Sequence, residues 1–389
     1  MKITKIEALV FSKKVPKEHQ LNWDGKAWGL RQLVVHKPFV KISTDEGIIG
    51  MGEPNISPNH LKVLVEETKP YLLGRDPCEI DNLSTPAFGE PISQDIMYVA
   101  YLAARGKPGF LAGINEALWD IAGKSAKAPV WKLLGGHYTD KVEAYASCGE
   151  LGNTVEDISK EAARMAELGF KGYKLRVTIK DYLEKVKAAR DALGDDVDLM
   201  IEWNFRLPNA KTAISAIKKV ERYELAWVEE PIPLGDIDGY AEIRAAVETP
   251  ISGGELLTSR YLFKERIDRG AYDIVQPDCC RMGISEAWKV AFLASLKGLP
   301  CVPHNWSGNG LNTAAQLNLL AAIPNHWYLE SNESYYGTCP TFKKLLFDGS
   351  PVPKKGYFYV PKRPGLGVEL NKEVATECAY IDGPSTAPI

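Results

Sequence analysis

Three acidic residues close three hydrophobic segments of the chain at nearly equal intervals. The segments are 198–202 (DLMIE), 225–229 (LAWVE) and 250–255 (PISGGE), so successive acids lie 27 and 26 residues apart (229 − 202 and 255 − 229). A parallel strand with its crossover helix needs a segment of this length. We therefore expect all three acids at the carboxyl-terminal edge of one parallel sheet. The alternative, that each acid only ends a strand or caps a helix, does not explain the even spacing.

Carboxylates brought together at one sheet edge repel one another unless a cation lies between them. Glu202, Glu229 and Glu255 offer only oxygen ligands, which favour a hard divalent ion. The spacing therefore predicts a metal site for Mg2+, with Mn2+ as the second choice.

From Lys141 onward, strand-like runs alternate with amphipathic helical stretches, as in a repeating βα unit. The runs begin near Val142, Gly172, Val197, Leu225, Pro250, Tyr272, Pro300 and Trp327. Eight such units close as a (β/α)8 barrel, whose carboxyl-terminal strand ends carry the site. An open doubly wound sheet is the alternative, but no Gly-x-Gly-x-x-Gly sequence opens a helix after a strand.

The first 130 residues lack this alternation. Strand-like segments at 2–11 and 33–43 precede helical patterns at 60–73 and 113–134, which indicates an α+β domain. We predict a capping domain over 1–130, the barrel over 131–345, and a segment over 346–389 that returns to the capping domain. The fold class is thus α/β, a modified TIM barrel with an α+β cap.

The loop from 15 to 29 carries Trp23 and Trp28 between two predicted strands. Exposed indoles in such a loop are typical of a lid that excludes water from a ligand, with Trp23 as a substrate contact. The alternative is that both indoles only pack the loop onto its own domain.

Further polar residues lie at the predicted strand ends. Alternation along the second strand puts Lys174 and Arg176 on one face. The remaining strand-end residues are Asn204, Glu230 beside Glu229, Asp278, His304 and Glu330. A carboxylate beside an imidazole orients it and raises its basicity, so we expect Asp278 and His304 to form a dyad. The alternatives are a structural histidine, and cations that only form salt bridges with the acids.

A divalent ion, a cationic patch and a histidine base together suit one kind of reaction. The ion binds a substrate carboxylate and stabilises the charge that appears when the adjacent C–H loses its proton. The residues therefore predict proton abstraction α to a carboxylate.

Composition excludes several other classes of protein. The chain has 389 residues, of which 45% are hydrophobic and 25% charged, as in ordinary soluble proteins. A formal net charge of −3 gives no basic surface for nucleic acid. No run of about 18 apolar residues is present to span a membrane. The first ten residues alternate like a strand and do not resemble a signal peptide, so we expect a cytoplasmic protein.

Several motifs together resemble one family along nearly the whole chain. They are TDEGIIGMGE (44–53), ALWDIAGK (117–124), LLGG (133–136), WVEEP (227–231), QPD (276–278), PHNW (303–306) and PGLGV (364–368). The chain resembles the enolase superfamily in its mandelate racemase-like branch. This resemblance implies a small-molecule carboxylate substrate and a homo-oligomer.

Carried over by position, the resemblance makes Glu202, Glu229 and Glu255 metal ligands, with Glu202 where the family more often has Asp. It implies a dyad of Asp278 and His304. Glu330 matches a hydrogen-bonding Glu of the branch. The chain departs from the family's Lys-x-Lys pattern, because Arg176 replaces the second lysine.

Arginine stays protonated, so it is a poor base and a good clamp for a carboxylate or hydroxyl. A racemase or epimerase needs a base on each face, a role that only Lys174 remains to fill. Dehydration needs one base, His304, and an acid, which is His304 again or Lys174. We therefore predict an Mg2+-dependent dehydratase of an aldonate or aldarate that forms a 2-keto-3-deoxy acid, with Asn204 and Arg176 contacting the substrate. Racemisation, epimerisation, cycloisomerisation and a non-catalytic binding protein are the alternatives.

Overall fold

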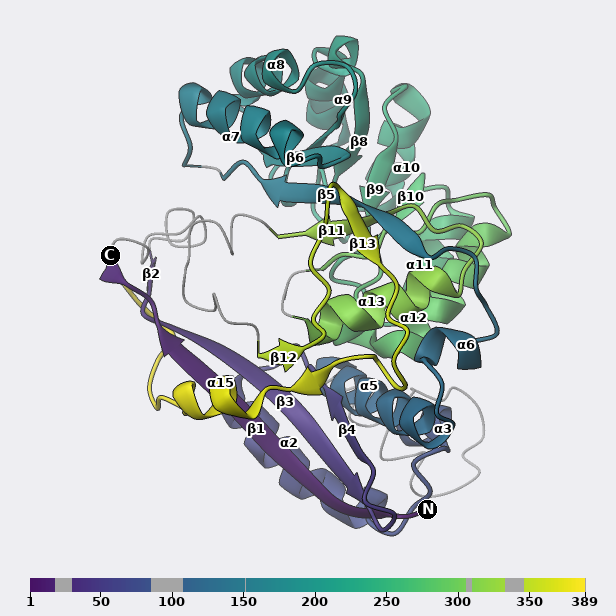
Figure 1. The fold of residues 1–389 in the computed structure, drawn as a ribbon. Helices are drawn as coiled ribbons and strands as arrows, with labels where there is room; N and C mark the ends of the chain where they lie inside the picture. The colour runs from purple at the N-terminus through teal and green to yellow at the C-terminus, as the bar shows by residue number, and fades with distance from the viewer. Residues whose placement is uncertain (18–29, 85–107, 151, 306–309, 333–345, 389) are drawn as a thin grey trace.

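The computed structural model describes residues 1–17, 30–84, 108–150, 152–305, 310–332 and 346–388. In Figure 1 the purple N-terminal domain lies below the teal and green barrel, and the yellow C-terminal segment runs between them. Trp23 and Trp28, and with them most of the predicted lid, lie outside the described residues.

The N-terminal domain is an antiparallel sheet covered by helices. Its strands are β1 (Ile3–Lys14), β3 (Val34–Thr44) and β4 (Ile49–Gly52), and its main helices are α2 (Pro58–Leu72) and α5 (Pro108–Ser125), with the short α3 (Ile80–Ser84). The single helical stretch expected over 113–134 is divided, because α5 ends at Ser125 and α6 (Val130–Leu133) follows Pro129. Lys127 has a left-handed backbone (φ 52°), and proline disfavours helical backbone at the preceding residue, so the chain is not helical between the two helices.

The barrel strands run parallel in chain order. They are β5 (Lys141–Cys148), β6 (Gly172–Arg176), β7 (Asp198–Glu202), β8 (Leu225–Glu229), β9 (Ile251–Gly253), β10 (Ile274–Val275) and β11 (Tyr328–Ser331). Cys301 forms parallel bridges with Val275 on one side and His326 on the other, and β11 pairs with β5. These bridges supply the seventh strand position, so the predicted eight-position barrel closes.

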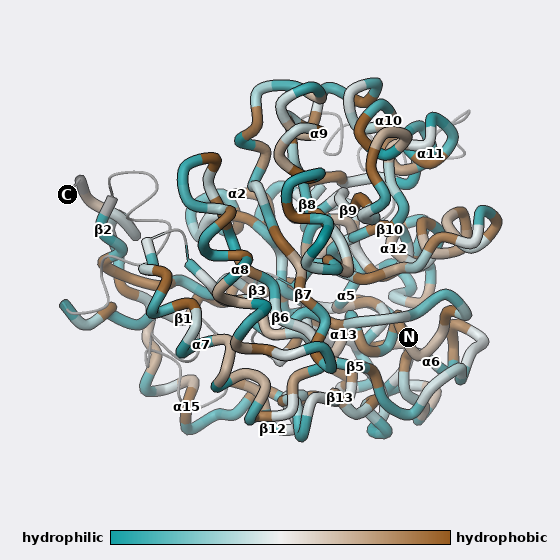
Figure 2. Tube along the Cα trace, turned by 90° about the horizontal axis from the view of Figure 1, so that it is seen from above, coloured by the Kyte–Doolittle hydropathy of each residue, from teal (hydrophilic) through white to brown (hydrophobic). Residues whose placement is uncertain are grey.

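Helices follow the barrel strands on the outside. They are α7 (Val155–Glu167), α8 (Tyr182–Leu193), α9 (Ala210–Lys218), α10 (Ile237–Ala246), α11 (Arg260–Asp268), α12 (Cys279–Ser295) and α13 (Leu311–Ala321). Local sequence fixes several starts: Thr154 and Asp157 form a capping box on α7, and Asn209 caps α9. In Figure 2 hydrophobic segments recur along strands such as β7, and hydrophilic ones mark many outer turns.

Large side chains fill the barrel interior on the amino-terminal side of the strand-end acids. One cluster contains Tyr145, Met200, Trp227, Ile274, Val302 and Tyr328, all at most 3% exposed. The Tyr145 and Trp227 rings meet edge to face, with centroids 5.3 Å apart. Because side chains alternate along a strand, Met200 and Trp227 share the inner face with the acids two residues further on. The aromatic cluster is therefore the floor beneath the strand-end acids.

The C-terminal segment joins both parts of the molecule. β12 (Phe347–Asp348) pairs with β14 (Glu369–Leu370), and β15 (Thr386–Pro388) pairs with β2 (Leu30–Gln32) of the N-terminal part. In contrast, β13 (Tyr357–Tyr359) pairs with barrel strand β5, so the expected return to the cap is not the segment's only contact. The short α15 (Lys372–Glu377) follows β14.

The cap is tied to the barrel through α5 and α12. Asn115 Nδ2 and Trp119 Nε1 on α5 donate to Ser285 Oγ on α12, at 2.9 and 3.0 Å. Both elements also lie close together in Figure 1. In the part of the chain that the structure describes, no helix is long and apolar enough to cross a membrane.

Candidate active site

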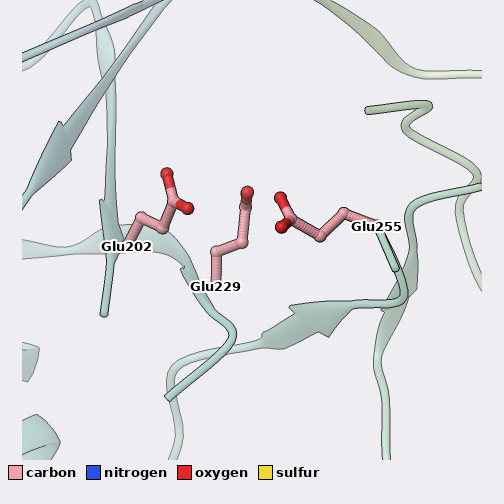
Figure 3. A group of neighbouring side chains, drawn as sticks. All are labelled: Glu202, Glu229 and Glu255. Carbon is pink, nitrogen blue, oxygen red and sulfur yellow. The ribbon is translucent and has the colours of Figure 1, made fainter. Parts of the chain in front are cut away.

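The three acids predicted as metal ligands meet at the barrel mouth (Figure 3). Glu202 and Glu229 are the last residues of β7 and β8 and stand in register, whereas Glu255 lies two residues beyond β9. One carboxylate oxygen of each residue lies within 4.8 Å of the other two. Glu202 and Glu229 are buried, and the Glu255 side chain is 12% exposed. The structure brings the three together, and their role as ligands stays a prediction.

Neutral donors from the barrel interior orient Glu229. Trp227 Nε1 donates to Glu229 Oε2 at 3.1 Å, and Gln276 Nε2 donates to the same oxygen at 2.7 Å. Glu229 Oε1 is left facing Lys174 Nζ, which bonds to it. Such outer contacts fix the orientation of a ligand and strengthen metal binding. Trp227 and Gln276 lie in two of the motifs that resemble the family, but the sequence did not predict that they contact Glu229.

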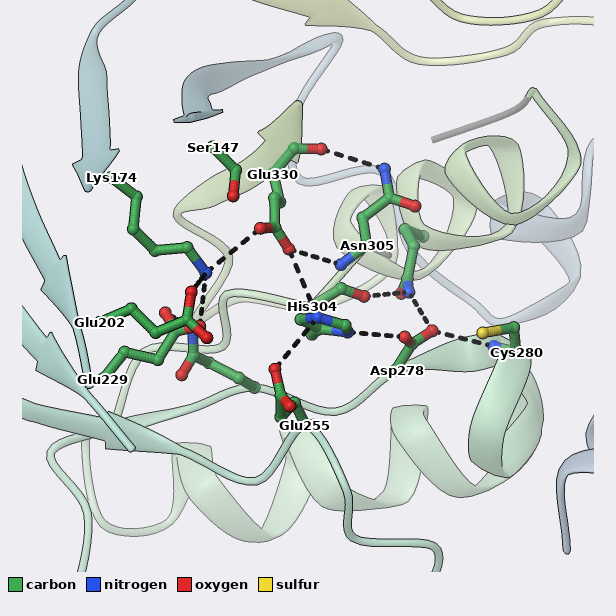
Figure 4. A network of polar contacts seen from close by, with 12 residues as sticks. Ser147, Lys174, Glu202, Glu229, Glu255, Asp278, Cys280, His304, Asn305 and Glu330 are labelled. Carbon is green, nitrogen blue, oxygen red and sulfur yellow. Dashed lines mark hydrogen bonds and ion pairs between the residues drawn. The ribbon is translucent and has the colours of Figure 1, made fainter. Parts of the chain in front are cut away.

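Lys174 lies among the carboxylates. Besides its bond to Glu229, Lys174 Nζ is 3.2 Å from Glu330 Oε1 and 3.4 Å from Glu202 Oε2 (Figure 4). Burial alone would lower the pKa of Lys174, but the charges of these three acids outweigh it and raise the pKa well above its usual range. Lys174 is therefore a charged donor here, which suits binding of a substrate oxygen.

Arg176 engages each of its three guanidinium nitrogens within the protein. Its Nη1 donates to Cys148 O at 3.2 Å, its Nη2 donates to Ser147 Oγ at 3.1 Å, and its Nε lies 3.2 Å from Glu202 Oε2. Burial opposes the charge of Arg176, yet Glu202 and its acidic neighbours raise the pKa further. The side chain cannot act as a base and braces Glu202 against β5. Its predicted contact with substrate stays a prediction.

Replacing Arg176 by lysine tests that brace. One ammonium cannot span Ser147 Oγ, Cys148 O and Glu202, so we expect kcat/KM for the substrate to fall about 10- to 100-fold, the effect of losing one or two charge-assisted bonds. Arg190→Lys is a matched control, because Arg190 bonds to backbone carbonyl groups such as Tyr223 O on the barrel exterior. Unchanged kcat/KM in Arg176→Lys would contradict the assignment.

The structure brings Asp278 and His304 together, and their catalytic role stays a prediction. His304 Nδ1 lies 2.8 Å from Asp278 Oδ2, and His304 Nε2 lies 3.1 Å from Glu255 Oε2 and 3.9 Å from Glu330 Oε2 (Figure 4). The Asp278 carboxylate accepts a hydrogen bond from the Nδ1–H group, so Nε2 faces Glu255 and Glu330. Burial alone would lower the pKa of His304, but Glu255, Glu330 and Asp278 raise it to about 9. His304 Nε2 thus faces the predicted metal ligands, and the acids around it favour its protonation.

Asp278 is itself held by donors from two helices. Its Oδ1 accepts from Cys280 N at 3.0 Å, Gln316 Nε2 at 3.1 Å and Asn312 Nδ2 at 3.2 Å. Burial opposes ionisation, but the bond from His304 keeps the pKa of Asp278 below its usual range. Asn312 and Gln316 were not predicted. Their signal is two amides four residues apart, which places both on one face of α13.

Glu330 lies between Lys174 and His304. Its Oε1 faces Lys174, and its Oε2 accepts from Asn305 N at 2.8 Å on the side of His304. Burial opposes the negative charge, but Lys174 and His304 lower the pKa of Glu330 strongly. Lys174 and His304 thus flank the same carboxylate from opposite sides.

Asn204 follows β7 in a left-handed conformation (φ 46°). Its Nδ2 donates to Glu202 Oε1, and its Oδ1 accepts from Arg206 Nη1 at 2.8 Å. Asn204 therefore lies beside a predicted metal ligand, and its predicted contact with substrate stays a prediction.

The residues fit a divalent cation. Glu202, Glu229, Glu255, Asp278 and Glu330 supply five negative charges when all are ionised. Lys174 and Arg176, together with Arg281 beside Asp278, supply three positive ones (5 − 3 = 2 in excess). Glu202 Oε2 is buried without a hydrogen bond among the described residues, although Lys174 Nζ and Arg176 Nε lie near it. A divalent ion at the three glutamates would balance this excess with His304 neutral.

The barrel, its cap and this strand-end site define the class of protein. Residues 31–135 match the model of the mandelate racemase / muconate lactonizing enzyme N-terminal domain, and residues 157–374 match that of the enolase C-terminal domain-like family. The chain belongs to the mandelate racemase / muconate lactonizing enzyme family of the enolase superfamily, whose members are Mg2+-dependent.

The chain is also similar to individual proteins of named activity. The chain is 31% identical over 379 residues to D-galactarolactone cycloisomerase of Agrobacterium fabrum (94% of this chain, 97% of that protein). It is 32% identical over 360 residues to D-galactonate dehydratase of Pectobacterium atrosepticum (87% and 90%). The crystal structure of 3,6-anhydro-D-galactonate cycloisomerase from Zobellia galactanivorans superposes with a TM-score of 0.80 at 28% identity, covering 98% of this chain and all of that one.

Proposed function

We propose that the protein is an Mg2+-dependent dehydratase of a sugar acid, an aldonate or aldarate. The observation that carries this proposal is that His304 Nε2 faces the cluster of Glu202, Glu229 and Glu255, while Arg176 is fixed in the barrel wall. One base above a cation site suits removal of a proton α to a carboxylate. Similarity to a D-galactonate dehydratase supports the choice of substrate class.

When bound by Glu202, Glu229 and Glu255, the ion supplies a positive charge that offsets the charge developing on the substrate carboxylate. The acidic neighbours of Lys174 keep its ammonium group protonated, and Nζ donates to a substrate oxygen on the β6 side. Glu330 keeps Lys174 and His304 apart and in place through its two oxygens. The substrate is thereby held between an acid and a base.

The chemical step transfers one proton and releases one water. His304 Nε2 takes the proton from C2, with Asp278 stabilising the imidazolium through Nδ1. The C2–H electron pair then forms the C2–C3 double bond as the C3–O bond breaks. The hydroxyl leaves as water with a proton from His304 or Lys174. The resulting enol tautomerises to the 2-keto-3-deoxy acid.

Cycloisomerisation is the second candidate, favoured by the similarity to two cycloisomerases. It begins with the same proton abstraction, but a ring oxygen leaves C3 in place of a hydroxyl. Mass spectrometry separates the two reactions, because dehydration lowers the product mass by one water and cycloisomerisation leaves it unchanged. Racemisation or epimerisation would need Lys174 as a second base, and in deuterated water it would give deuterated product with lost configuration.

Metal removal tests the proposal directly. Without the ion, five acids face three permanent cations, and the charge that develops on the substrate carboxylate is no longer offset by a divalent charge. Dialysis against EDTA is therefore expected to abolish turnover. Mg2+ should restore it fully and Mn2+ substantially, as read from the steady-state rate after each addition. Full activity in the EDTA-treated, metal-free protein would contradict a metal-dependent reaction.

A further inference from the structure

Glu255 is held differently from the other two predicted ligands. Glu202 and Glu229 end their strands inside the hydrogen-bonded barrel, but Glu255 follows Gly253 and Gly254 beyond β9. Gly254 has a φ of +112°, which L side chains rarely adopt, and glycine allows the backbone many other conformations. A ligand after two glycines needs another contact to fix its position.

The Glu230 side chain provides that contact. Glu230 is fully buried behind the ligand cluster, and its Oε1 accepts from the backbone N–H of Gly254 at 2.6 Å. Its Oε2 bonds to Tyr240 Oη on α10, which also lies 2.8 Å from Ile232 O. The carboxyl group thus joins the residue before Glu255 to a helix outside the barrel.

The backbone of Glu230 extends the connection to the other ligand loops. Its N–H donates to Ser252 O at 3.2 Å, and its carbonyl accepts from Phe205 N at 2.7 Å. These bonds hold Glu230 at a left-handed φ of 40°, which is unusual for a residue with a side chain. One residue therefore contacts the segments that follow β7 and β9, while directly following Glu229 on β8.

The turn has room for no side chain at either glycine, and at Gly253 the space is taken by the Glu230 carboxyl group. A Cβ at Gly253 would lie 2.9 Å from Glu230 Oε1 and 2.8 Å from Tyr272 Cε1. A Cβ at Gly254 would overlap the Phe263 ring. The Glu230 side chain therefore packs directly against the backbone of Gly253 and Gly254 and restrains it.

We propose that Glu230 is a positioning residue that fixes Glu255 relative to Glu202 and Glu229 and so sets the affinity of the metal site. This inference rests on the metal-dependent function proposed above. Glu230 touches neither ion nor substrate and acts through the Gly254 N–H. Residues of this kind commonly change metal affinity about 10- to 100-fold.

The test is Mn2+ binding to the full-length protein, followed by the electron paramagnetic resonance signal of free Mn2+. Glu230→Ala removes the acceptor of the Gly254 N–H and is expected to weaken Mn2+ binding at least about tenfold. Glu230→Gln keeps an oxygen for Gly254 and places an amide against Tyr240 Oη, whose proton is then available to Ile232 O. It is expected to bind Mn2+ within about threefold of the wild type.

Two hydroxyl deletions form a matched pair. Tyr240→Phe removes the second partner of the Glu230 carboxyl and is expected to weaken Mn2+ binding about threefold. Tyr272→Phe deletes a hydroxyl from the adjoining ring, whose centroid is 5.5 Å from that of Tyr240, and should leave Mn2+ binding unchanged. Thermal unfolding of each metal-free variant separates a loss of affinity from a loss of fold.

The outcomes are distinct. Equal Mn2+ affinity in wild type and a folded Glu230→Ala overturns the positioning role and leaves the proposed function standing, as does a loss in Glu230→Gln as large as in Glu230→Ala. If Glu230→Ala does not fold, equal affinities in Tyr240→Phe and Tyr272→Phe overturn it. A wild-type protein that binds no Mn2+ contradicts the metal-dependent function itself.

Discussion

His304→Ala is expected to lower kcat for the sugar-acid substrate about 10²- to 10⁴-fold, the usual contribution of a positioned general base. The reason is geometric, because His304 Nε2 is the imidazole nitrogen that faces the three glutamates, and Asp278 fixes the tautomer through Nδ1. Steady-state rates with saturating Mg2+ provide the measurement.

His137→Ala is the control for that variant. His137 lies on the surface, where its Nε2 is 3.2 Å from Asp140 Oδ1, and its loss should leave kcat unchanged. Asp278→Asn should lower kcat as well, since a neutral amide does not stabilise the imidazolium. Retention of wild-type kcat in a folded His304→Ala would show that another group takes the proton.

Glu229→Gln is expected to weaken metal binding by about 10²-fold or more and to remove measurable turnover. Glu229 lies between the other two ligands (Figure 3), and Trp227 and Gln276 orient its carboxylate toward the shared centre. An amide at this position lacks the charge that attracts the ion, and replacing a ligand should cost at least as much as replacing an outer contact. Titration calorimetry with Mg2+ or Mn2+ measures the loss.

Glu286→Gln is a matched control for the loss of a buried carboxylate. Glu286 on α12 accepts from Arg260 N at 2.9 Å, away from the three ligands, so its amide variant should bind metal normally. Wild-type metal affinity in Glu229→Gln would remove Glu229 from the ligand set and with it the proposed centre.

The strand-end acids could be foreseen because a parallel barrel imposes strict order on the chain. Each βα unit returns the chain to the same edge, so the even spacing of Glu202, Glu229 and Glu255 already indicated one site. The same reasoning placed Asp278 beside His304, and the 2.8 Å contact confirms that proximity. Periodic local sequence and barrel closure carried these predictions.

Contacts between distant segments could not be foreseen in the same way. The position of Arg176 on the inner face of β6 was predictable, but its bonds to Ser147 and Cys148 depend on how β5 and β6 align. The contact from Gln276 to Glu229 spans two neighbouring strand ends of the barrel. Hydrogen bonds of this kind are set by tertiary packing, for which one sequence carries no periodic signal.

Glu230 shows the limit of strand periodicity. Alternation along β8 places it on the face opposite Glu229, which describes a residue pointing out of the barrel. The structure instead gives it a left-handed backbone, which brings its carboxyl group to the Gly254 N–H. The break between α5 and α6 is of another type, because Pro129 is a local signal in the sequence against one continuous helix.

The most direct test of the central claim is a screen of the Mg2+-loaded protein against aldonates and aldarates, with 2-keto acid formation detected by semicarbazide. The account predicts that at least one sugar acid yields a 2-keto-3-deoxy product, and that EDTA and His304→Ala each abolish the signal. A product of unchanged mass would contradict the dehydratase assignment. It would favour cycloisomerisation if that product is a 2-keto acid, and epimerisation if it is not.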